Sequence, residues 1–599
     1  MRSPLAGFAV ANAVLIAWTL AAVLQPFVGS SGSLPAELLH RLLPFTLVLA
    51  AAGTGLIARA LPLERRGAFL GRHFAFYLVV PLMLLVLEPS QDRQPALGAL
   101  YVLGALAWSA HALEGLWHSI GNLGDRAGAL HLAALVLVPF LAIMPYHSAV
   151  LPTAADEPHY LVIVQSIDDD HDLDLKNQYD EETYRSFYNA PLPDRHVIHV
   201  GPLEYPIRDL GLPAIATIPF ALGGRDGVLG LLCLVGAALT AQLFLVCRDL
   251  HIAHRPAMLA VAGAALAHPL LTYTTLVYPE LLIALAFITA ARLLRRGRAT
   301  TGRALLAASA CVGVLPWLST RAWLIAVGVG LVVAYCALRP ALRLTARERL
   351  LRIAAGAVPF AALVLLAAYA DYRMFGWFMP SAGYYLVSDQ QQVLTFAPQL
   401  GALGLLFDRV FGLIPHTPFF LIAAIGVIPL IRRARSATFA ALGLGWLLYF
   451  LFIASIAYWW ADGSPPSRYL LAALPFLVVL LAAGIEQLEV LSRLRVAAQV
   501  VAWTLAAYSL FIAFVYAVLP SVGYELAADI RGTGSEGALF PYVGRVFRPD
   551  PGAVFPSIVD ARMSDVAVAA AWLALLLGCV SIGWISARGG MSARPASLR

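Results

Sequence analysis

A polar, acidic segment between two long apolar regions holds the residues best suited to chemistry. It extends from residue 151 to about Asp209 and contains 13 of the 35 acidic residues of the chain. It begins with the adjacent carboxylates Asp156 and Glu157, directly after an apolar run. A carboxylate partly shielded from water has a raised pKa, which suits general-base catalysis. An equally good interpretation of the residues alone is that this pair ends the apolar helix as interfacial charge.

A second acidic cluster lies farther along the same loop, at residues 168–175 (Asp-Asp-Asp-His-Asp-Leu-Asp-Leu). Clustered carboxylates are ligands for divalent cations. The run lacks the glycine and the terminal glutamate of an EF-hand loop, so a solvated acidic turn is the stronger interpretation. We therefore expect no obligatory metal and no other cofactor, with a divalent cation at this run as the alternative.

Two arginines interrupt apolar surroundings farther along the chain. Arg321 lies in Leu-Pro-Trp-Leu-Ser-Thr-Arg-Ala-Trp (315–323), and Arg468 follows Ser-Pro-Pro-Ser (464–467). An arginine within or between membrane spans is costly unless it is paired, and guanidinium groups bind phosphate in a bidentate manner. Both are candidates for binding a phosphate. The alternative is that each side chain extends to lipid head groups, which is a strong alternative for Arg468 alone.

Several other polar or aromatic residues are candidates for substrate binding. Glu280 follows Tyr-Pro and would equally well stabilise the first turn of its own helix. Trp459 and Trp460 suit stacking on a sugar ring as well as anchoring at the membrane interface. The full set of substrate-binding candidates is His159, Tyr160, Glu280, Trp459, Trp460 and Asp462.

The composition indicates a polytopic membrane protein. Of the 599 residues, 60% are hydrophobic and only 13% are charged, whereas soluble domains carry about 25% charged residues. The net charge of +6 is no sign of nucleic-acid binding, because the arginines gather at the ends of apolar runs. The five cysteines all lie in apolar runs without metal-ligand spacing. Lysine occurs once, at Lys176, which we attribute to a GC-rich bacterial genome.

Runs of roughly 20 apolar residues are long enough to cross a bilayer as helices. About 16 such runs predict an all-α polytopic bundle. The candidate spans are 6–28, 42–60, 74–88, 96–117, 129–150, 227–247, 257–272, 279–294, 303–318, 322–338, 353–370, 416–431, 437–457, 468–485, 496–518 and 566–586.

The arginine-rich connections predict the orientation of the chain. They follow even-numbered candidate spans, at 59–72, 292–303, 339–352, 432–435, 493–495 and 588–599. By the positive-inside rule these connections and both termini are cytoplasmic. The acidic loop, Arg321, Glu280 and Arg468 then share the opposite, extracytoplasmic face of a bacterial inner (plasma) membrane.

The chain divides into four regions on this basis. Residues 1–150 form an N-terminal module of five spans, and residues 151–226 form the catalytic loop. Within that loop, Leu212–Leu222 is apolar but too short to cross, so we expect an interfacial or re-entrant helix that ends at Gly223 and Gly224. Residues 227–518 form the transmembrane core, and residues 519–599 an outer loop, a last span and a cytoplasmic tail.

These features together resemble the GT-C superfamily of membrane glycosyltransferases, which includes the protein O-mannosyltransferases and the lipid A aminoarabinose transferases. The resemblance covers residues 150–485 approximately. It is carried by Asp-Glu-Pro-His-Tyr (156–160) with Asp-Leu-Asp-Leu (172–175), Leu-Pro-Trp-Leu-Ser-Thr-Arg (315–321), Leu-Phe-Asp-Arg-Val-Phe-Gly (406–412), and Trp459-Trp460 with Ser-Pro-Pro-Ser-Arg-Tyr (464–469). The chain departs from familiar members in placing about five spans before the catalytic loop.

The resemblance implies an inverting transfer of a hexosyl or pentosyl group from a polyprenyl-phosphate donor to a hydroxyl of a glycan, lipid or protein. Asp156 would deprotonate that hydroxyl, Glu157 would support Asp156 or orient the acceptor, and Arg321 with Arg468 would stabilise the leaving phosphate.

Two other function classes fit the same topology. A transporter or a lipid or glycolipid flippase is one, although the chain shows no paired halves and its polar residues gather on one side. An outer-face glycan polymerase or ligase would share the chemistry and differ in its acceptor.

Overall fold

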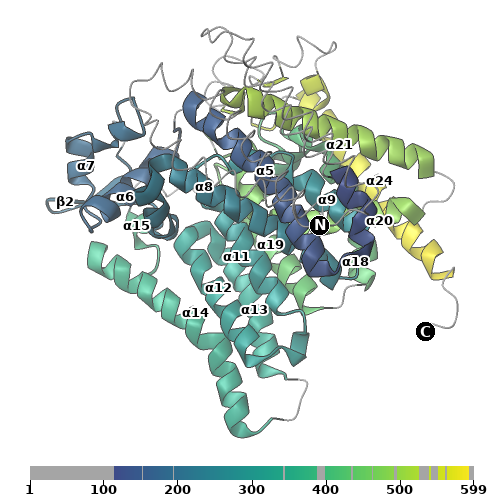
Figure 1. Cartoon of the computed structure of the whole chain (residues 1–599), viewed down its shortest axis with the longest axis horizontal. Helices are drawn as coiled ribbons and strands as arrows, with labels where there is room; N and C mark the ends of the chain where they lie inside the picture. The colour runs from purple at the N-terminus through teal and green to yellow at the C-terminus, as the bar shows by residue number, and fades with distance from the viewer. Residues whose placement is uncertain are drawn as a thin grey trace, which may run out of the picture.

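The computed structural model describes residues 113–592, except for 152, 193–194, 341–343, 387–397, 434–435, 462, 491–494, 525–538, 541–550 and 560–562. These residues are mostly helical (Figure 1). The candidate spans 6–28, 42–60 and 74–88, and most of 96–117, lie outside the described residues, as does Asp462.

The α-helices are α5 (Asp125–Val150), α6 (Glu157–Asp169), α7 (Lys176–Asp180), α8 (Gly211–Asp249), α9 (His254–Ala265), α10 (Leu270–Tyr273), α11 (Glu280–Leu293), α12 (Gly302–Leu318), α13 (Trp323–Leu338), α14 (Ala346–Phe375), α15 (Ala382–Leu386), α16 (Pro398–Phe407), α17 (Leu413–His416), α18 (Leu421–Arg433), α19 (Ala437–Ser455), α20 (Arg468–Val490), α21 (Arg495–Val518) and α24 (Met563–Ser592). Short 3₁₀ turns are η2 (Ile120–Asn122), η3 (Thr183–Ser186), η4 (Gly297–Ala299), η5 (Thr320–Ala322), η7 (Pro418–Phe420), η8 (Pro520–Gly523) and η9 (Pro551–Val554). Strands β1 (Val197–Val200) and β2 (Leu203–Pro206) form an antiparallel hairpin.

The membrane-helical architecture is confirmed, whereas the count of about 16 spans is not. Eight helices of the described residues are long and apolar enough to cross a membrane: α5, α8, α13 with η5, α14, α19, α20, α21 and α24. Helices α12, α16 and α18 are apolar but shorter. The candidate span 257–272 is divided between α9 and the single turn α10, so it is not one continuous helix.

The expected break at Gly223 and Gly224 is present. Both glycines have non-helical backbone angles, with φ of −156° and +56°, so α8 consists of two helices joined at a kink. The first of them carries exposed apolar side chains, with Ile218 71% and Leu222 70% exposed. An apolar face of this kind suits a helix in contact with lipid.

The helices pack in groups that bring distant parts of the sequence together. Helix α5 lies against α8, α14 against α12, and α13 against α19, while α18 lies between α20 and α24 (Figure 1). The contact between α18 and α20 depends on two glycines. A Cβ atom on Gly426 would lie 2.0 Å from the carbonyl oxygen of Leu480, and one on Gly484 would lie 2.1 Å from that of Ile422. Small residues allow this close approach of membrane helices.

The acidic loop folds over the end of the bundle as α6, α7 and the β1–β2 hairpin. Within its acidic run, Asp172 accepts from the backbone N–H of Asp174 (3.0 Å) in a local turn. Asp174 accepts from the backbone N–H of Glu204 (2.9 Å), which ties the run to strand β2. Asp170 accepts a hydrogen bond from Asn177 (2.8 Å). Among the described residues, no three His, Cys, Asp or Glu side chains are grouped so that they could hold a metal ion.

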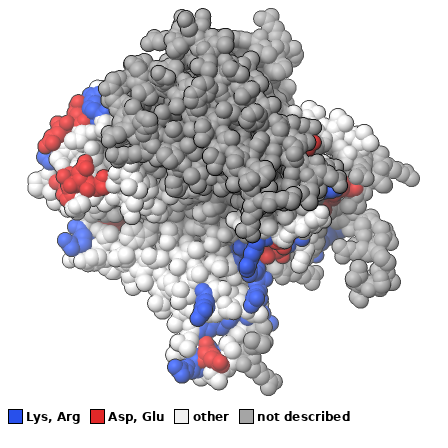
Figure 2. Space-filling model, viewed as in Figure 1, with Lys and Arg blue, Asp and Glu red and all other residues white. Residues whose placement is uncertain are grey.

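Charged side chains are unevenly distributed in Figure 2. Acidic ones gather on the left of the view together with some basic ones, and basic ones predominate near the lower ends of the helices. Arg298 and Arg352 bridge the connections before α12 and α14 through backbone carbonyl groups. The placement of the arginine-rich connections on the cytoplasmic face stays a prediction.

Asp408, in the segment Leu406–Gly412, connects two segments of the chain through hydrogen bonds to their backbones. It is 1% exposed and accepts hydrogen bonds from the backbone N–H groups of Val410 (2.9 Å), Phe411 (2.9 Å), Ile558 (2.7 Å) and Val559 (3.3 Å). Its carboxylate therefore joins the end of α16 to the segment that precedes α24.

Replacing Asp408 with Ala should destabilise the protein and loosen that segment. Each buried N–H left without an acceptor costs about 1–3 kcal/mol. Thermal unfolding and limited proteolysis around residues 551–559 would measure the effect. Asp408→Asn is the graded control, because its one carbonyl oxygen can still accept from two of the four N–H groups, so it should recover only part of the stability. Equal stability of Asp408→Ala and the wild type would contradict this role.

Candidate functional site

Asp156 lies between two arginines at the start of α6. It occupies the N-cap position, yet its side chain makes no capping hydrogen bond. Its carboxylate instead forms ion pairs with Arg208, through Oδ1 and Nη2, and with Arg468, through Oδ2 and Nη1 at 2.9 Å. Burial alone would raise the pKa of Asp156, but the two guanidinium groups hold that pKa far below its usual range. Asp156 is therefore an ionised carboxylate in the free protein.

Arg468 connects Asp156 to a second predicted residue, Glu280. The Arg468 Nε donates to Glu280 Oε1 at 2.8 Å, and the two side chains are only 4% and 5% exposed. The guanidinium also lies 4.1 Å from the centroid of the Tyr278 ring. Within the described residues, Oε2 of Glu280 has no hydrogen-bond partner. Arg468 thus takes part in a buried network, and extension to lipid head groups does not describe it.

Arg321 and Arg468 both lie near the same aromatic ring, that of Tyr469. The guanidinium carbon of Arg321 is 4.5 Å from the centroid of Tyr469, and that of Arg468 is 5.8 Å from the same centroid. No carboxylate forms an ion pair with Arg321 within the part of the chain that the structure describes. The predicted pair of phosphate-binding arginines is therefore brought together, with one positive charge still able to accept an anion.

Arg208 is a functional candidate that the sequence analysis did not select. It is one of four basic residues in an otherwise acidic loop, and that isolation is the signal that could have identified it. Besides Asp156, it contacts Nδ1 of His196 at 3.1 Å. His196 in turn stacks on His159 with ring centroids 3.8 Å apart. His159 is thus joined to the site through His196, and its burial together with His196 lowers its pKa to about 3.

The other catalytic candidate, Glu157, points into a different contact network. It is completely buried, accepts from the backbone N–H of Val277 (2.9 Å), and accepts from the hydroxyl of Tyr524 (3.3 Å). Burial raises the pKa of Glu157. These contacts fasten the start of α6 to the turn before Glu280. Support of Asp156 by Glu157 and orientation of the acceptor both stay predictions.

The remaining predicted residues lie at different depths. Tyr160 is buried beside the arginines, and burial raises its pKa well above its usual range. Trp459 and Trp460 pack edge to face, 5.5 Å apart, and are 7% and 8% exposed. A Cβ on Gly404 would lie 2.2 Å from the Trp459 ring, so this tryptophan is packed against α16. Sugar stacking by either tryptophan stays a prediction.

Asp209 is a second residue that the sequence analysis did not select. Its carboxylate accepts from the backbone N–H of Thr320 at 2.9 Å and from the Thr320 hydroxyl at 3.1 Å. Burial raises the pKa of Asp209 to about 6, although the hydrogen bonds from Thr320 and the charges of Arg321 and Arg208 oppose the rise. Tyr384 also faces this carboxylate. Asp209 was passed over because it lies at the end of a loop already rich in carboxylates.

The raised pKa of Asp209 predicts a pH-dependent contribution to stability. The ordinary pKa of an aspartate in an unfolded chain is about 3.9, below the value of about 6 in the folded protein. Between these two values the folded state binds more protons, so wild-type stability should fall as the pH rises through this window. The melting temperature of the wild type minus that of Asp209→Asn should therefore decrease from pH 4 to pH 7. A constant difference would contradict the shift.

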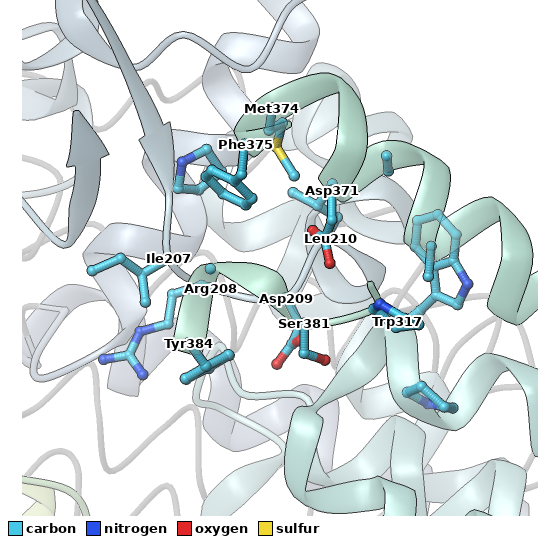
Figure 3. A pocket seen from close by; sticks show the side chains of 16 residues that line it. Ile207, Arg208, Asp209, Leu210, Trp317, Asp371, Met374, Phe375, Ser381 and Tyr384 are labelled. Atoms are coloured by element: carbon cyan, nitrogen blue, oxygen red, sulfur yellow. The ribbon is translucent and has the colours of Figure 1, made fainter. Parts of the chain in front are cut away.

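A small cavity borders the arginine and carboxylate residues. It has a volume of about 40 Å³ and is lined by Arg208, Asp209, Trp317, Asp371, Ser381 and Tyr384, among others. In Figure 3, Asp371 and its neighbours on α14 lie across the cavity from Asp209 and Tyr384. Asp371 accepts from the backbone N–H of Ala382 (2.9 Å), which holds α15 beside the end of α14. Arg208 and Asp209 are therefore next to open space.

No protein-family model matches the chain, and no curated protein matches it in sequence. Solved structures that are similar to it include the following two. One is the archaeal oligosaccharyltransferase AglB from Archaeoglobus fulgidus in complex with an inhibitory peptide and a dolichol-phosphate, with 14% identity and a TM-score of 0.38. The other is the oligosaccharyltransferase of Archaeoglobus fulgidus in the apo form, with 15% identity and a TM-score of 0.36.

Each similarity covers 71% of this chain and 60% of the other. The chain thus spans about three fifths of the length of these structures. Both solved proteins are oligosaccharyltransferases. TM-scores at this level carry no weight for function, which is inferred below from the residues of the site.

Proposed function

We propose that this protein is an inverting glycosyltransferase that moves a sugar from a polyprenyl-phosphate donor to an acceptor hydroxyl. One observation carries the proposal: Arg321, which has no ionic partner among the described residues, shares the Tyr469 ring with Arg468, which holds Asp156. A phosphate-binding group and a carboxylate able to act as a base are thus adjacent. Both lie at one end of a bundle of membrane-length helices.

The membrane location favours a lipid-linked donor. A polyprenyl chain keeps the donor in the bilayer and presents its phosphate at the interface. There Arg468 begins α20, and Arg321 lies in η5, directly before α13. Among the described residues, the arginine-rich connections before α12 and α14 lie at the ends of these helices that are farther from the site. By the positive-inside rule this arrangement supports a site on the extracytoplasmic face. We assign the protein to a bacterial plasma membrane with both termini in the cytoplasm.

The proposed reaction is a single displacement. The carboxylate of Asp156 removes the proton of the acceptor hydroxyl as the oxygen attacks the anomeric carbon. The bond from that carbon to the phosphate oxygen breaks, its electron pair leaves with polyprenyl phosphate, and the anomeric configuration inverts. Arg321 and Arg468 stabilise the charge that develops on the leaving phosphate. Asp156 then returns the proton to water.

The two ion pairs of Asp156 suggest a way in which donor binding increases the basicity of its carboxylate. A carboxylate whose pKa is held far below its usual range is a weak base. A donor phosphate bound to Arg321 and Arg468 would compete with Asp156 for Arg468. The pKa of Asp156 then rises, so its basicity increases when the donor is in place. The proposal includes no metal ion, because arginines supply the positive charge.

The test uses the purified protein in lipid nanodiscs with a panel of polyprenyl-phosphate hexoses and pentoses. We expect release of polyprenyl phosphate from at least one donor, slow with water and faster with an acceptor glycan, lipid or peptide. The anomeric configuration of the product should be inverted, and a chelator should leave the rate unchanged. Movement of intact donor across the membrane without release would instead support a flippase and contradict the proposal.

A further inference from the structure

Asp209 joins the two segments that carry arginines of the site. Its carboxylate binds the backbone N–H and the hydroxyl of Thr320, at 2.9 and 3.1 Å, across 111 positions of sequence. Arg208 precedes Asp209 and Arg321 follows Thr320, so each arginine is one residue away from this pair of hydrogen bonds. Consecutive Cα atoms lie 3.8 Å apart. The contact between Asp209 and Thr320 therefore limits how far the backbones of Arg208 and Arg321 can separate.

The two arginines have different partners. Arg208 is paired with Asp156, and Arg321 lies on Tyr469 without an ionic partner among the described residues. Thr320 itself is held in a tight turn, in which Ser319 Oγ accepts from the backbone N–H of Arg321 at 3.3 Å. Asp209 thus connects the segment that holds the carboxylate base with the turn that presents the phosphate-binding arginine.

We infer that Asp209 is a positioning residue that sets the distance between Asp156 and the donor phosphate on Arg321. This inference rests on the proposed function, since it assumes that a phosphate binds there. The charge of Asp209 adds to the effect, because a carboxylate near both Arg208 and Arg321 reduces the repulsion between these like charges. The charges of both arginines act on the Asp209 carboxylate, and Tyr384 lines the same cavity.

A purely structural contact would not need a carboxylate at this place. Removing a carboxylate from water is costly, and here the cost appears as a pKa near 6. Asparagine could keep both contacts with Thr320, through its carbonyl oxygen and its amide group, without that cost. A role in arranging charged groups accounts for the carboxylate, whereas simple fastening of two loops does not.

The experiment measures binding of citronellyl phosphate, a short soluble prenyl phosphate, and of the alcohol citronellol to the protein in nanodiscs. Asp209→Ala should weaken citronellyl phosphate binding by roughly tenfold or more. Thr320→Val loses the hydroxyl contact but keeps the backbone N–H, so it should weaken that binding by a smaller factor. Binding of citronellol should not change, although a general distortion of the site would weaken both. Thr320→Ser, which keeps the N–H and the hydroxyl, is the matched control and should bind like the wild type.

Three further results decide between the possibilities. Asp209→Asn keeps both contacts with Thr320 but not the charge, so it should recover only part of the phosphate affinity. The double variant Asp209→Ala/Thr320→Val should be no weaker than Asp209→Ala, because the contact with Thr320 is already lost in Asp209→Ala. Wild-type affinity in Asp209→Ala and Thr320→Val would overturn the positioning role and leave the proposed function intact. A wild-type protein that does not bind citronellyl phosphate would overturn the proposed function, and the positioning role with it.

Discussion

Asp156→Asn should lose sugar transfer by at least about a hundredfold, the usual contribution of a general base. Asparagine keeps the shape of the side chain and one oxygen that accepts a hydrogen bond from an arginine, but it cannot remove a proton. The variant also lacks the charge that pairs with Arg208 and Arg468. Release of polyprenyl phosphate in nanodiscs, compared with the wild type, measures the loss.

The matched control for this variant is Asp180→Asn. Asp180 forms exposed ion pairs with Lys176 and Arg195 in the same acidic loop and makes no contact with the site. Its replacement should change neither transfer nor melting temperature noticeably, because exposed ion pairs contribute little. Asp156→Asn should insert into the membrane and elute in gel filtration as the wild type does. Near-wild-type transfer by that variant would exclude Asp156 as the base.

Arg468→Gln should cause the largest loss of stability of any substitution in the site, about 3–5 kcal/mol. The side chain is 4% exposed and forms ion pairs with both Asp156 and Glu280, so its removal leaves Glu280 buried without a cation. Arg468→Lys keeps the positive charge, but its single ammonium group cannot bind two carboxylates at once as the planar guanidinium group does. This variant should therefore recover only part of the stability.

A double-mutant cycle distinguishes this pairing from a general packing effect. Glu280→Gln removes the charge that Arg468→Gln would strand, so the double variant should be more stable than the sum of the two single losses predicts. Thermal unfolding of the four proteins in the same detergent supplies the measurement. Strict additivity would show that Arg468 and Glu280 do not interact energetically, and would contradict the buried network described above.

The sequence predicts the fold where the physical signal is local. Apolar length identifies the spans, and two adjacent glycines mark the break in α8, because both properties belong to short stretches of chain. The division of 257–272 into α9 and α10 was not predicted, since hydropathy does not show where a helix ends inside an apolar run. The small β1–β2 hairpin in the loop was also missed.

The site could be predicted only in part, for a related reason. Asp156 and Arg468 stand out individually as charges beside apolar runs, but nothing in either segment shows that the two side chains meet. Arg208 and Asp209 were passed over because their importance depends on partners far away in sequence. Glu157 illustrates the reverse case, because adjacency to Asp156 suggested a shared location, whereas helix geometry turns the two side chains toward different partners.

A structure of the protein in nanodiscs with a bound polyprenyl phosphate tests the central claim most directly. We predict phosphate density between the guanidinium groups of Arg321 and Arg468, beside Tyr469, with Asp156 released from Arg468 and facing the anomeric position. Phosphate bound elsewhere, with the ion pair between Asp156 and Arg468 intact, would contradict both the proposed donor site and the proposed activation of the base.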